Sequence, residues 1–352
     1  MALYNKIDGK VLKERIQQSD EKRTTISFYK YAKIGNLEVF RDHLFTELSK
    51  EEVLGRIYVA NEGINAQISV LSNAIEEFQE KLNEITFLQG VRLNVAVEDD
   101  GKSFFKLKIL VREKIVADGL HDDQFDASNC GQHLDANEFN NLVEDPNTIL
   151  IDMRNHYESE VGHFKGAITP DVDTFRDSLP IIEEMLEGNE EKNLVMYCTG
   201  GIRCEKASAY YKYKGFKQVF QLNGGIINYV KQVNDEGLEN KFIGKNFVFD
   251  ERLGERVSPE IISNCHTCGK PCDDHLNCKN DACHLLFIQC SECKETFNNC
   301  CSTECVEFLE WPEDERKEFK RGLNNSQQIY KKGRKSNFVE QFLAFKAGNN
   351  KL

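Results

Sequence analysis

The sequence predicts an α/β protein of three folded parts, and three observations carry this prediction. Residues 24–116 alternate segments of strand character with segments of helical periodicity. Residues 126–235 repeat the order of buried strand, turn and helix that is typical of a parallel sheet. Ten of the thirteen cysteines lie between Cys265 and Cys305, which indicates a small Cys-rich domain. We place the parts at residues 1–120, 126–240 and 241–312, followed by a basic tail at 313–352.

The N-terminal part is expected to follow the order strand, helix, strand, strand, helix, strand. The segments are a strand at 24–31, a helix after the cap Asn36, strands at 56–59 and 64–70, a helix after the capping pair Asn73 and Glu76, and closing strands at 91–95 and 104–116. This order predicts a ferredoxin-like (acylphosphatase-like) α+β sandwich.

One expected strand of this sandwich has a cationic face. Phe105, Leu107, Ile109 and Val111 alternate with polar positions, so the period of two gathers the cations on the opposite face, with Leu110 as the exception. The cations of that face are Lys106, Lys108, Arg112 and Lys114. A solvated polar face is the ordinary interpretation of such a pattern. Because no acid lies among these four cations on their face, a patch that binds RNA phosphates is an equal alternative.

The central part is expected to be a parallel sheet with helices on both sides. Strands are predicted at 148–151 and 194–196, and a helix is predicted from His133 to Phe139. In such sheets ligands bind beyond the carboxyl ends of the strands. The loop after residues 194–196 is therefore the first place to look for a site.

That loop has the sequence YCTGGIRC, from Tyr197 to Cys204. Gly200 and Gly201 allow backbone N–H groups to approach an anion or a reactive sulfur, and the helix that follows adds partial positive charge. With Arg203 nearby, these surroundings favour the thiolate form of Cys198, which is the nucleophilic form. A buried cysteine at a strand end is the plain alternative, but it would not require two glycines and an arginine in one turn.

The spacing and the upstream residues give the loop a resemblance. Four residues separate Cys198 from Arg203, one fewer than in cysteine-based phosphatases. Asp152-Met153-Arg154, Glu158 and the segment 162–167 (GHFKGA) resemble a pattern of the rhodanese family. The segment 222–226 (LNGGI) resembles that family's closing Gly-Gly turn. The resemblance implies a rhodanese-like domain with a loop sized for a sulfane sulfur on Cys198.

Cys204 has two interpretations. It can act as a resolving thiol that forms a disulfide with an oxidised Cys198. It can also occupy a position where many rhodaneses have serine and help to cap the helix, which is the simpler interpretation.

The cysteine cluster has the spacing of a metal site. Cys265 and Cys268 form one C-x-x-C knuckle, and Cys290 and Cys293 form another, as in zinc ribbons. The segment is short and polar, so a structural zinc ion would supply stability that a small apolar core cannot. Disulfides or redox-active thiols, and inert thiols, are the alternatives.

Net charge, apolar runs and cysteine count limit which partners and which cellular location we expect. The formal net charge of −13 opposes non-specific nucleic-acid binding, and we expect no DNA partner. From residue 313 onward ten Lys/Arg stand against five Asp/Glu, so this tail is either a solvated face or a phosphate contact. No apolar run is long enough for a bilayer, and the first residues lack an apolar signal core. With thirteen cysteines and no export signal, a cytoplasmic protein is expected, without a membrane partner.

Longer strings give the whole chain a second resemblance, to the rhodanese-related bacterial tRNA uridine hydroxylases. They are 23–31, 61–69, 115–119, 152–158, 196–208, 244–252 and 278–290. The resemblance implies O2-dependent formation of 5-hydroxyuridine at the wobble position of tRNA, with tRNA as partner and O2 as cosubstrate. It matches Cys198 to the family's active-site cysteine. The reductant is not identified, and the sequence contains no Gly-x-Gly-x-x-Gly cofactor motif.

Several mechanistic alternatives stay open. Cys198 could add to the pyrimidine as a thiolate, or carry a persulfide or oxidised sulfur. His121-Asp122-Asp123 is a fragment of an iron-site pattern, although acidic loops with a histidine are common. Tyr29 or Tyr31 could stack on a base, but core or strand positions are the simpler interpretation. A sulfurtransferase is the main alternative activity, and a non-catalytic binding module is a third.

Overall fold

The computed structural model describes residues 3–120, 125–323 and 328–348, and its contacts divide the chain into two compact units. Unit 1 comprises Met1–Ser159, His163–Phe242 and Asn246–Val257, and unit 2 comprises Glu160–Gly162, Ile243–Lys245 and Ser258–Leu352. Among the described helices, none is both long and apolar enough to cross a bilayer. The expected fold class, an acylphosphatase-like sandwich, a parallel α/β domain and a Cys-rich region, is confirmed.

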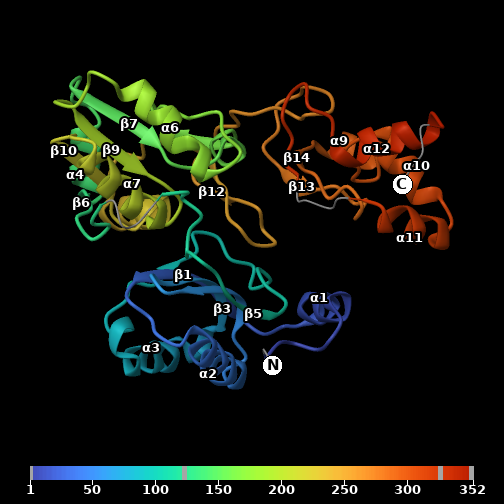
Figure 1. Cartoon of the computed structure of the whole chain (residues 1–352), viewed down its shortest axis with the longest axis horizontal. Coiled ribbons are helices and arrows are strands. Elements are labelled where there is room, and N and C mark those ends of the chain that lie inside the picture. The colour runs from blue at the N-terminus through green and yellow to red at the C-terminus, as the bar shows by residue number, and fades with distance from the viewer. Residues whose placement is uncertain (1–2, 121–124, 324–327, 349–352) are drawn as a thin grey trace. The chain divides into compact units, whose positions relative to one another are not determined.

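The N-terminal part of unit 1 is a five-stranded sheet in the order β4-β1-β3-β2-β5. The strands are β1 (Arg23–Tyr31), β2 (Leu54–Ala60), β3 (Gly63–Leu71), β4 (Asn94–Val95) and β5 (Leu107–Val111). β1 is antiparallel to β3 and β4, β2 is antiparallel to β3, and β5 is parallel to β2. Helices α2 (Leu37–Lys50) and α3 (Ile75–Glu84) cover one face of the sheet (Figure 1). The first four strands thus have the ferredoxin-like order.

Local details of this part differ from the predictions. Asn36 precedes α2 but has a φ of 47° and makes no side-chain capping bond. Asn73 lies inside the 3₁₀ turn η1 (Ser72–Ala74), and Ala74 is the N-cap of α3, so the predicted capping pair is wrong. A further 3₁₀ turn, η2 (Thr86–Leu88), follows α3. β4 and β5 are shorter than expected, and an additional helix, α1 (Gly9–Gln18), begins after Asp8, whose carboxylate accepts from the Lys10 amide at 2.8 Å.

The central part of unit 1 is a parallel sheet in the order β6-β10-β9-β7. Its strands are β6 (Gln132–Leu134), β7 (Thr148–Asp152), β9 (Asn193–Tyr197) and β10 (Gln218–Leu222). Its helices are α4 (Ala136–Leu142), α5 (His156–Ser159), α6 (Phe175–Leu186), α7 (Ile202–Tyr213) and α8 (Gly225–Glu236). His133 and Leu134 end β6 and do not begin a helix as predicted, because α4 starts after Asp135 with a capping box to Glu138.

Alternation along β9 explains why helices cover both faces of this sheet. Leu194 and Met196 pack with α6 and α7, whereas Val195 and Tyr197 pack with α4 and α8. Successive side chains of a strand point to opposite faces, so an apolar run builds two cores at once.

Unit 2 holds the Cys-rich region. Its elements are the hairpin β13 (His275–Asn277) and β14 (Leu286–Ile288), and the helices α9 (Ser291–Thr296), α10 (Thr303–Glu310), α11 (Glu313–Arg321) and α12 (Asn337–Lys346).

A separate three-stranded sheet consists of β8 (Gly162–Phe164), β11 (Phe242–Asn246) and β12 (Glu255–Arg256).

The segment expected to be a basic tail is part of the unit 2 core. Phe319 of α11 and Phe338 and Phe342 of α12 are buried and pack around Phe308 of α10. Cations of this segment pair with acids, as Lys320 does with Asp281 at 2.5 Å. Charge counting missed this role because the aromatic residues at helical spacing, and not the cations, determine the packing.

Candidate active site

The strand β9, the loop 198–201 and the helix α7 place Cys198 at the carboxyl end of the parallel sheet. Gly201 is the N-cap of α7 and has a φ of 98°, in the left-handed region that favours glycine. A Cβ added at Gly201 would lie 2.9 Å from the Tyr29 hydroxyl. The loop therefore requires glycine at this position both for its backbone conformation and for the approach of β1.

The Cys198 thiol is buried, with 1% of the residue exposed, and is surrounded by donors. The Gly201 amide donates to Sγ at 3.2 Å. Burial alone would raise the pKa of Cys198, but a hydrogen bond from the Cys204 thiol, the Arg203 charge and the amides of Arg203 and Gly201 outweigh it and lower the pKa to about 6. At neutral pH the group is therefore mainly a thiolate, the form able to act as a nucleophile.

Glu158 holds Arg203 in place. The guanidinium donates two parallel hydrogen bonds to the Glu158 carboxylate, at 2.9 and 2.8 Å, and a third to the Met153 carbonyl at 3.2 Å. Burial would lower the pKa of Arg203, but the Glu158 carboxylate outweighs it and raises the pKa above its usual value. The bidentate pair orients a permanent positive charge beside Cys198.

The Asp152-x-Arg154 part of the motif has a different role. The two side chains form a second bidentate pair, with Nε donating to Oδ1 at 2.9 Å and Nη2 donating to Oδ2 at 2.6 Å. Both are fully buried at the end of β7, so they fix the backbone next to the loop and do not face a ligand.

The turn Gly224-Gly225 at the start of α8 holds the active-site loop through backbone hydrogen bonds. The Ile226 amide donates to the Cys198 carbonyl at 3.0 Å, and the Ile227 amide donates to the Thr199 carbonyl at 3.2 Å. A Cβ on Gly225 would lie 2.5 Å from the Cys198 carbonyl oxygen. The start of α8 can therefore bind the loop backbone only because this residue is glycine.

Cys204 does not cap α7, contrary to the simpler interpretation of the sequence. The helix begins at Ile202 with Gly201 as its N-cap, so Cys204 lies within the first turn, and its thiol is hydrogen-bonded to Cys198. Burial and this bond raise the pKa of Cys204 well above its usual value. A protonated Cys204 next to an ionised Cys198 stabilises the thiolate, and it also lies where a resolving thiol would have to lie.

A cavity of about 400 Å³ in unit 1 opens onto the loop. Its walls include Cys198, Gly200 and Arg203 on the parallel-sheet side and the helix-free face of the N-terminal sheet on the other. Phe249, whose ring lies 5.7 Å from the Arg203 guanidinium carbon, adds an apolar wall. The volume and the mixture of apolar walls with a few polar groups are those of a small-molecule or nucleobase pocket.

The polar residues of that sheet face were not predicted from the sequence as part of the site. The register aligns Arg56 with Gln67 and Tyr58 with Asn65, and all four line the cavity. The Asn65 amide donates to the Ile115 carbonyl at 3.1 Å, and the Arg56 guanidinium donates to the Phe249 carbonyl at 3.2 Å. Their alternation with buried apolar residues was visible in the sequence, but the identity of the face they meet was not.

Tyr29 and Tyr31 share this face and are half-buried. The Tyr29 hydroxyl donates to Glu205 Oε1 at 3.0 Å, and its ring lines the cavity. Tyr31 donates to the Ile202 carbonyl at 3.4 Å. Both hydroxyls thus link β1 to α7, and of the two rings Tyr29 lies where a base could contact it.

The predicted cationic face divides into two groups. Lys108 is exposed and lies opposite Arg56 in the register of β2 and β5, so its side chain is on the same face of the sheet as the cavity-lining residues. By alternation, Lys106 and Arg112 belong to this face as well. Lys114 lies beyond the end of β5 and donates to the Asp118 carboxylate at 2.6 Å and to the Leu120 carbonyl at 2.6 Å. Its charge is therefore compensated within the protein.

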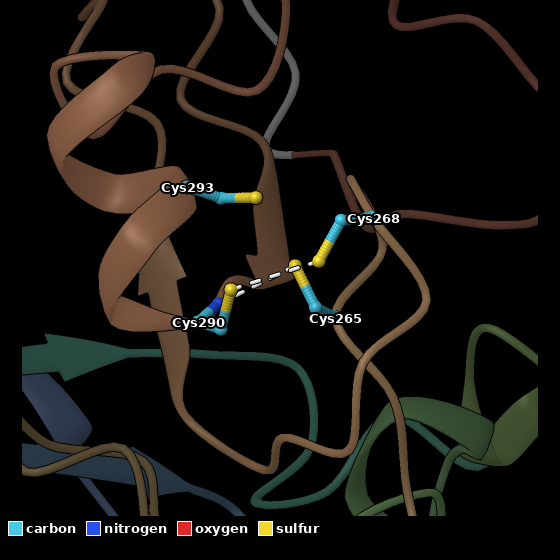
Figure 2. A group of neighbouring side chains, drawn as sticks. All are labelled: Cys265, Cys268, Cys290 and Cys293. Atoms are coloured by element: carbon cyan, nitrogen blue, oxygen red, sulfur yellow. Dashed lines mark hydrogen bonds between the residues drawn. The ribbon is translucent and has the colours of Figure 1, made fainter.

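The two predicted knuckles meet in unit 2. Cys265 and Cys268 come from a loop, and Cys290 and Cys293 come from the start of α9, with their sulfur atoms facing one another (Figure 2). All four lie within 4.8 Å of one another, and the sulfurs of Cys268 and Cys290 are 3.7 Å apart. Four thiolates at this spacing fit a tetrahedral zinc ion. The fragment His121-Asp122-Asp123 lies outside the described residues.

Comparisons with known proteins agree with this arrangement. Family models match at residues 23–115 ("UPF0176 acylphosphatase like domain"), 135–232 ("Rhodanese-like domain") and 243–306 ("Rhodanase C-terminal"). The chain is 54% identical over 333 residues to the tRNA uridine(34) hydroxylases of Yersinia pestis (strain Pestoides F) and Yersinia enterocolitica (strain NCTC 13174 / 8081). The alignments cover 94% of this chain and 94% or 95% of those proteins.

A solved rhodanese-like domain from an Anabaena protein is 20% identical to this chain, with a TM-score of 0.26. The match covers 32% of this chain and 78% of the Anabaena chain. The resemblance stated from the sequence is confirmed by the full-length relatives.

Proposed function

We propose that this chain, which belongs to the tRNA uridine(34) hydroxylase family, converts the wobble uridine of tRNA into 5-hydroxyuridine. The observation that carries the proposal is the low-pKa thiol of Cys198 in the wall of a cavity large enough for a nucleobase. Oxygen gas is the proposed cosubstrate.

The chemistry assigned to Cys198 is nucleophilic. Its thiolate adds to C6 of the uracil ring, so that a C–S bond forms and the electrons of the C5–C6 double bond move toward C5 and the O4 carbonyl. The electron-rich C5 then accepts an oxygen atom. Loss of the C5 proton and cleavage of the C–S bond restore the double bond and release Cys198 as a thiolate.

The overall conversion balances only with a reductant. One oxygen atom of O2 enters the C5–OH group, and the other leaves as water, which requires two electrons and two protons. A two-electron donor is therefore part of the proposed reaction.

Groups on the sheet face suit the uracil edge. Asn65 and Gln67 present amide groups, and Arg56 presents a guanidinium, in the cavity that contains Cys198. Hydrogen bonds from such donors would stabilise negative charge that develops on a uracil carbonyl after addition at C6. The Arg203 charge and the Gly201 amide, with Gly200 beside them, would stabilise the thiolate before addition and after release.

A wobble base suits this cavity because it lies in a loop and needs no opening of a duplex. Lys106, Lys108 and Arg112 are proposed to contact the tRNA backbone next to the base, whereas Lys114 is proposed only as a structural cation. Because tRNA is made and used in the cytoplasm of bacteria, the proposed substrate favours a cytoplasmic enzyme.

We also assign a structural zinc ion to Cys265, Cys268, Cys290 and Cys293. The four sulfur atoms already have the spacing of a tetrathiolate site, and the metal would stabilise a polar loop region.

Labelling with heavy oxygen gas tests the activity. Cells that lack the enzyme would be complemented with the wild-type chain, with Cys198→Ala, or with Cys272→Ala, which removes a buried thiol remote from the loop in sequence and outside the zinc quartet. Heavy oxygen is expected in position 5 of the wobble uridine with the wild type and Cys272→Ala, and the Cys198→Ala signal is expected to fall by about 10³-fold or more.

Two results would contradict the proposal. Sulfur incorporation without heavy oxygen would identify a sulfurtransferase that carries sulfane sulfur on Cys198. Full labelling with Cys198→Ala would identify a chain in which this loop is not catalytic.

A further inference from the structure

A second group of four cysteines lies in unit 2. Cys278, Cys283, Cys301 and Cys305 have sulfur atoms within 4.8 Å of one another. The sulfurs of Cys283 and Cys301 are 3.6 Å apart, and those of Cys301 and Cys305 are 3.7 Å apart. In a tetrahedral site with Zn–S bonds of about 2.3 Å, neighbouring sulfurs are about 3.8 Å apart. A disulfide would require about 2.0 Å, so the spacing is that of a metal site.

The two groups interleave along the chain. The pair 265/268 belongs to the first quartet, 278/283 to the second, 290/293 to the first and 301/305 to the second. Each quartet therefore joins two loops separated in sequence by a pair from the other quartet. Each quartet thus closes a loop that contains one cysteine pair of the other, and together the two quartets span the whole segment 265–305.

The same local contacts recur in both quartets. In the first, the Cys290 amide donates to the Cys265 sulfur at 3.4 Å. In the second, the Cys301 amide donates to the Cys278 sulfur at 3.4 Å. In both quartets, therefore, the backbone amide of the third cysteine donates a hydrogen bond to the sulfur of the first cysteine. Amide donors of this kind balance the negative charge of thiolates that bind a metal.

The loops around the first pairs also match. The Cys265 amide donates to the Lys270 carbonyl at 2.8 Å, and the Cys278 amide donates to the Leu285 carbonyl at 2.8 Å. Each acceptor lies two residues after the second cysteine of its pair. The residue between is in the left-handed region in both loops, Gly269 with a φ of 78° and His284 with a φ of 50°.

The second pairs come from helix starts in both cases. Cys290 is the N-cap of α9 and Cys293 lies in its first turn, whereas Cys301 precedes the N-cap Ser302 of α10 and Cys305 lies in its first turn. Each quartet is therefore a loop clamped against the beginning of a helix, and the second is a variant of the first with wider spacing.

From this repetition we propose that unit 2 binds two zinc ions in interleaved tetrathiolate sites, the second formed by Cys278, Cys283, Cys301 and Cys305. Zinc is the expected metal because it is redox-inert and prefers four thiolates in tetrahedral geometry. The second site is expected to contribute more to the core of unit 2 than the first, since Cys278, Cys283 and Cys305 are buried within the aromatic core around Phe308.

Metal counting on the full-length chain tests the proposal independently of tRNA modification. Elemental analysis of the protein purified under reducing conditions is expected to give about two zinc ions per chain. The neighbours Cys300 and Cys301 provide a matched pair, because both precede α10 but only Cys301 belongs to the quartet. Cys300→Ala is expected to retain two zinc ions, and Cys301→Ala to retain about one or fewer.

A conservative variant keeps the test decisive if Cys301→Ala does not fold. Cys301→His supplies a nitrogen ligand that zinc accepts in three-cysteine sites, so it is expected to restore the count to about two. One zinc or none in the wild type, iron in place of zinc, zinc loss in Cys300→Ala with retention in Cys301→Ala, or disulfides among the four cysteines would each overturn the proposal.

Discussion

The cysteines of unit 1 and unit 2 lie in opposite surroundings. In unit 1 the sulfur of Cys198 is single, faces a cavity, and is ionised by an arginine, a neighbouring thiol and backbone amides. In unit 2 eight sulfur atoms gather in two groups of four at the spacing of metal sites. We therefore expect the neighbours of each thiol to decide its role: a single thiolate beside a cation is expected to stay reactive, whereas four thiolates together are expected to bind a metal.

Metal removal is expected to have the largest effect and to affect only one side of this comparison. Binding of a structural zinc ion contributes on the order of 10 kcal/mol to the folding of small zinc domains, so a strong chelator should unfold unit 2. Hydrogen exchange measured along the full-length chain should then show loss of protection in residues 265–310 and little change in β1, β3 and β9. Retained protection in α9 and α10 would show that the cysteines stabilise unit 2 without metal.

Breaking the Arg203–Glu158 pair is expected to be the next largest effect. Arg203→Met leaves the buried Glu158 carboxylate without its partner, which costs about 3–5 kcal/mol of unfolding free energy. Adding Glu158→Gln should recover part of that loss, because the unpaired Glu158 charge is then removed from the interior. The midpoints of denaturant unfolding measure both changes.

The exposed pair Lys217–Glu191, with an N–O distance of 2.5 Å, provides the control. Lys217→Met should leave the unfolding midpoint unchanged, since solvent screens such pairs. Equal losses for Arg203→Met and Lys217→Met would contradict the assignment of a special role to the buried pair.

The pH dependence of Cys198 reactivity is a third test. Since only the thiolate reacts, alkylation by a small reagent should rise about tenfold per pH unit below about 6 and level off above it. Cys204→Ala removes a hydrogen bond that lowers the pKa of Cys198, so the midpoint should move to higher pH, whereas Cys204→Ser retains a donor and should shift it less. Mass spectrometry of the labelled peptide measures the rates. A midpoint near that of a free thiol in the wild type would remove the contrast with an ordinary cysteine.

The smallest expected effect concerns the cationic face of β5. Lys108→Ala should weaken tRNA binding and reduce the slope of log affinity against log salt by about 0.7–0.9, the change for one phosphate contact. Lys114→Met should leave that slope unchanged, because Asp118 and Leu120 already bind the Lys114 ammonium. Filter binding across a salt series measures both. Equal slopes for Lys108→Ala and the wild type would exclude Lys108 from the RNA contact.

Local sequence patterns predicted most of the fold. Three local patterns specify their own conformation through side-chain sterics and backbone freedom. They are the β-branched run of β1, the apolar run of β9 and the pair Gly200-Gly201 before α7. The helix caps were less predictable. Asn36 and Asn73 are suitable capping residues, but neither side chain caps a helix, and α2 and α3 instead share a buried core with the sheet.

Short-range spacing in the sequence was sufficient to identify the loop from Cys198 to Arg203, the strand–turn–helix order of the domain that carries it, and the C-x-x-C pairs. The folded structure was needed to show that Glu158 binds Arg203 and that Arg56, Tyr58, Asn65 and Gln67 face the cavity. It was also needed to show that the pair 278/283 combines with 301/305, whereas the grouping of 265/268 with 290/293 was predicted from their spacing. The physical reason is that these contacts join residues far apart in the chain, and the sequence specifies each partner separately but not which of many possible partners it meets.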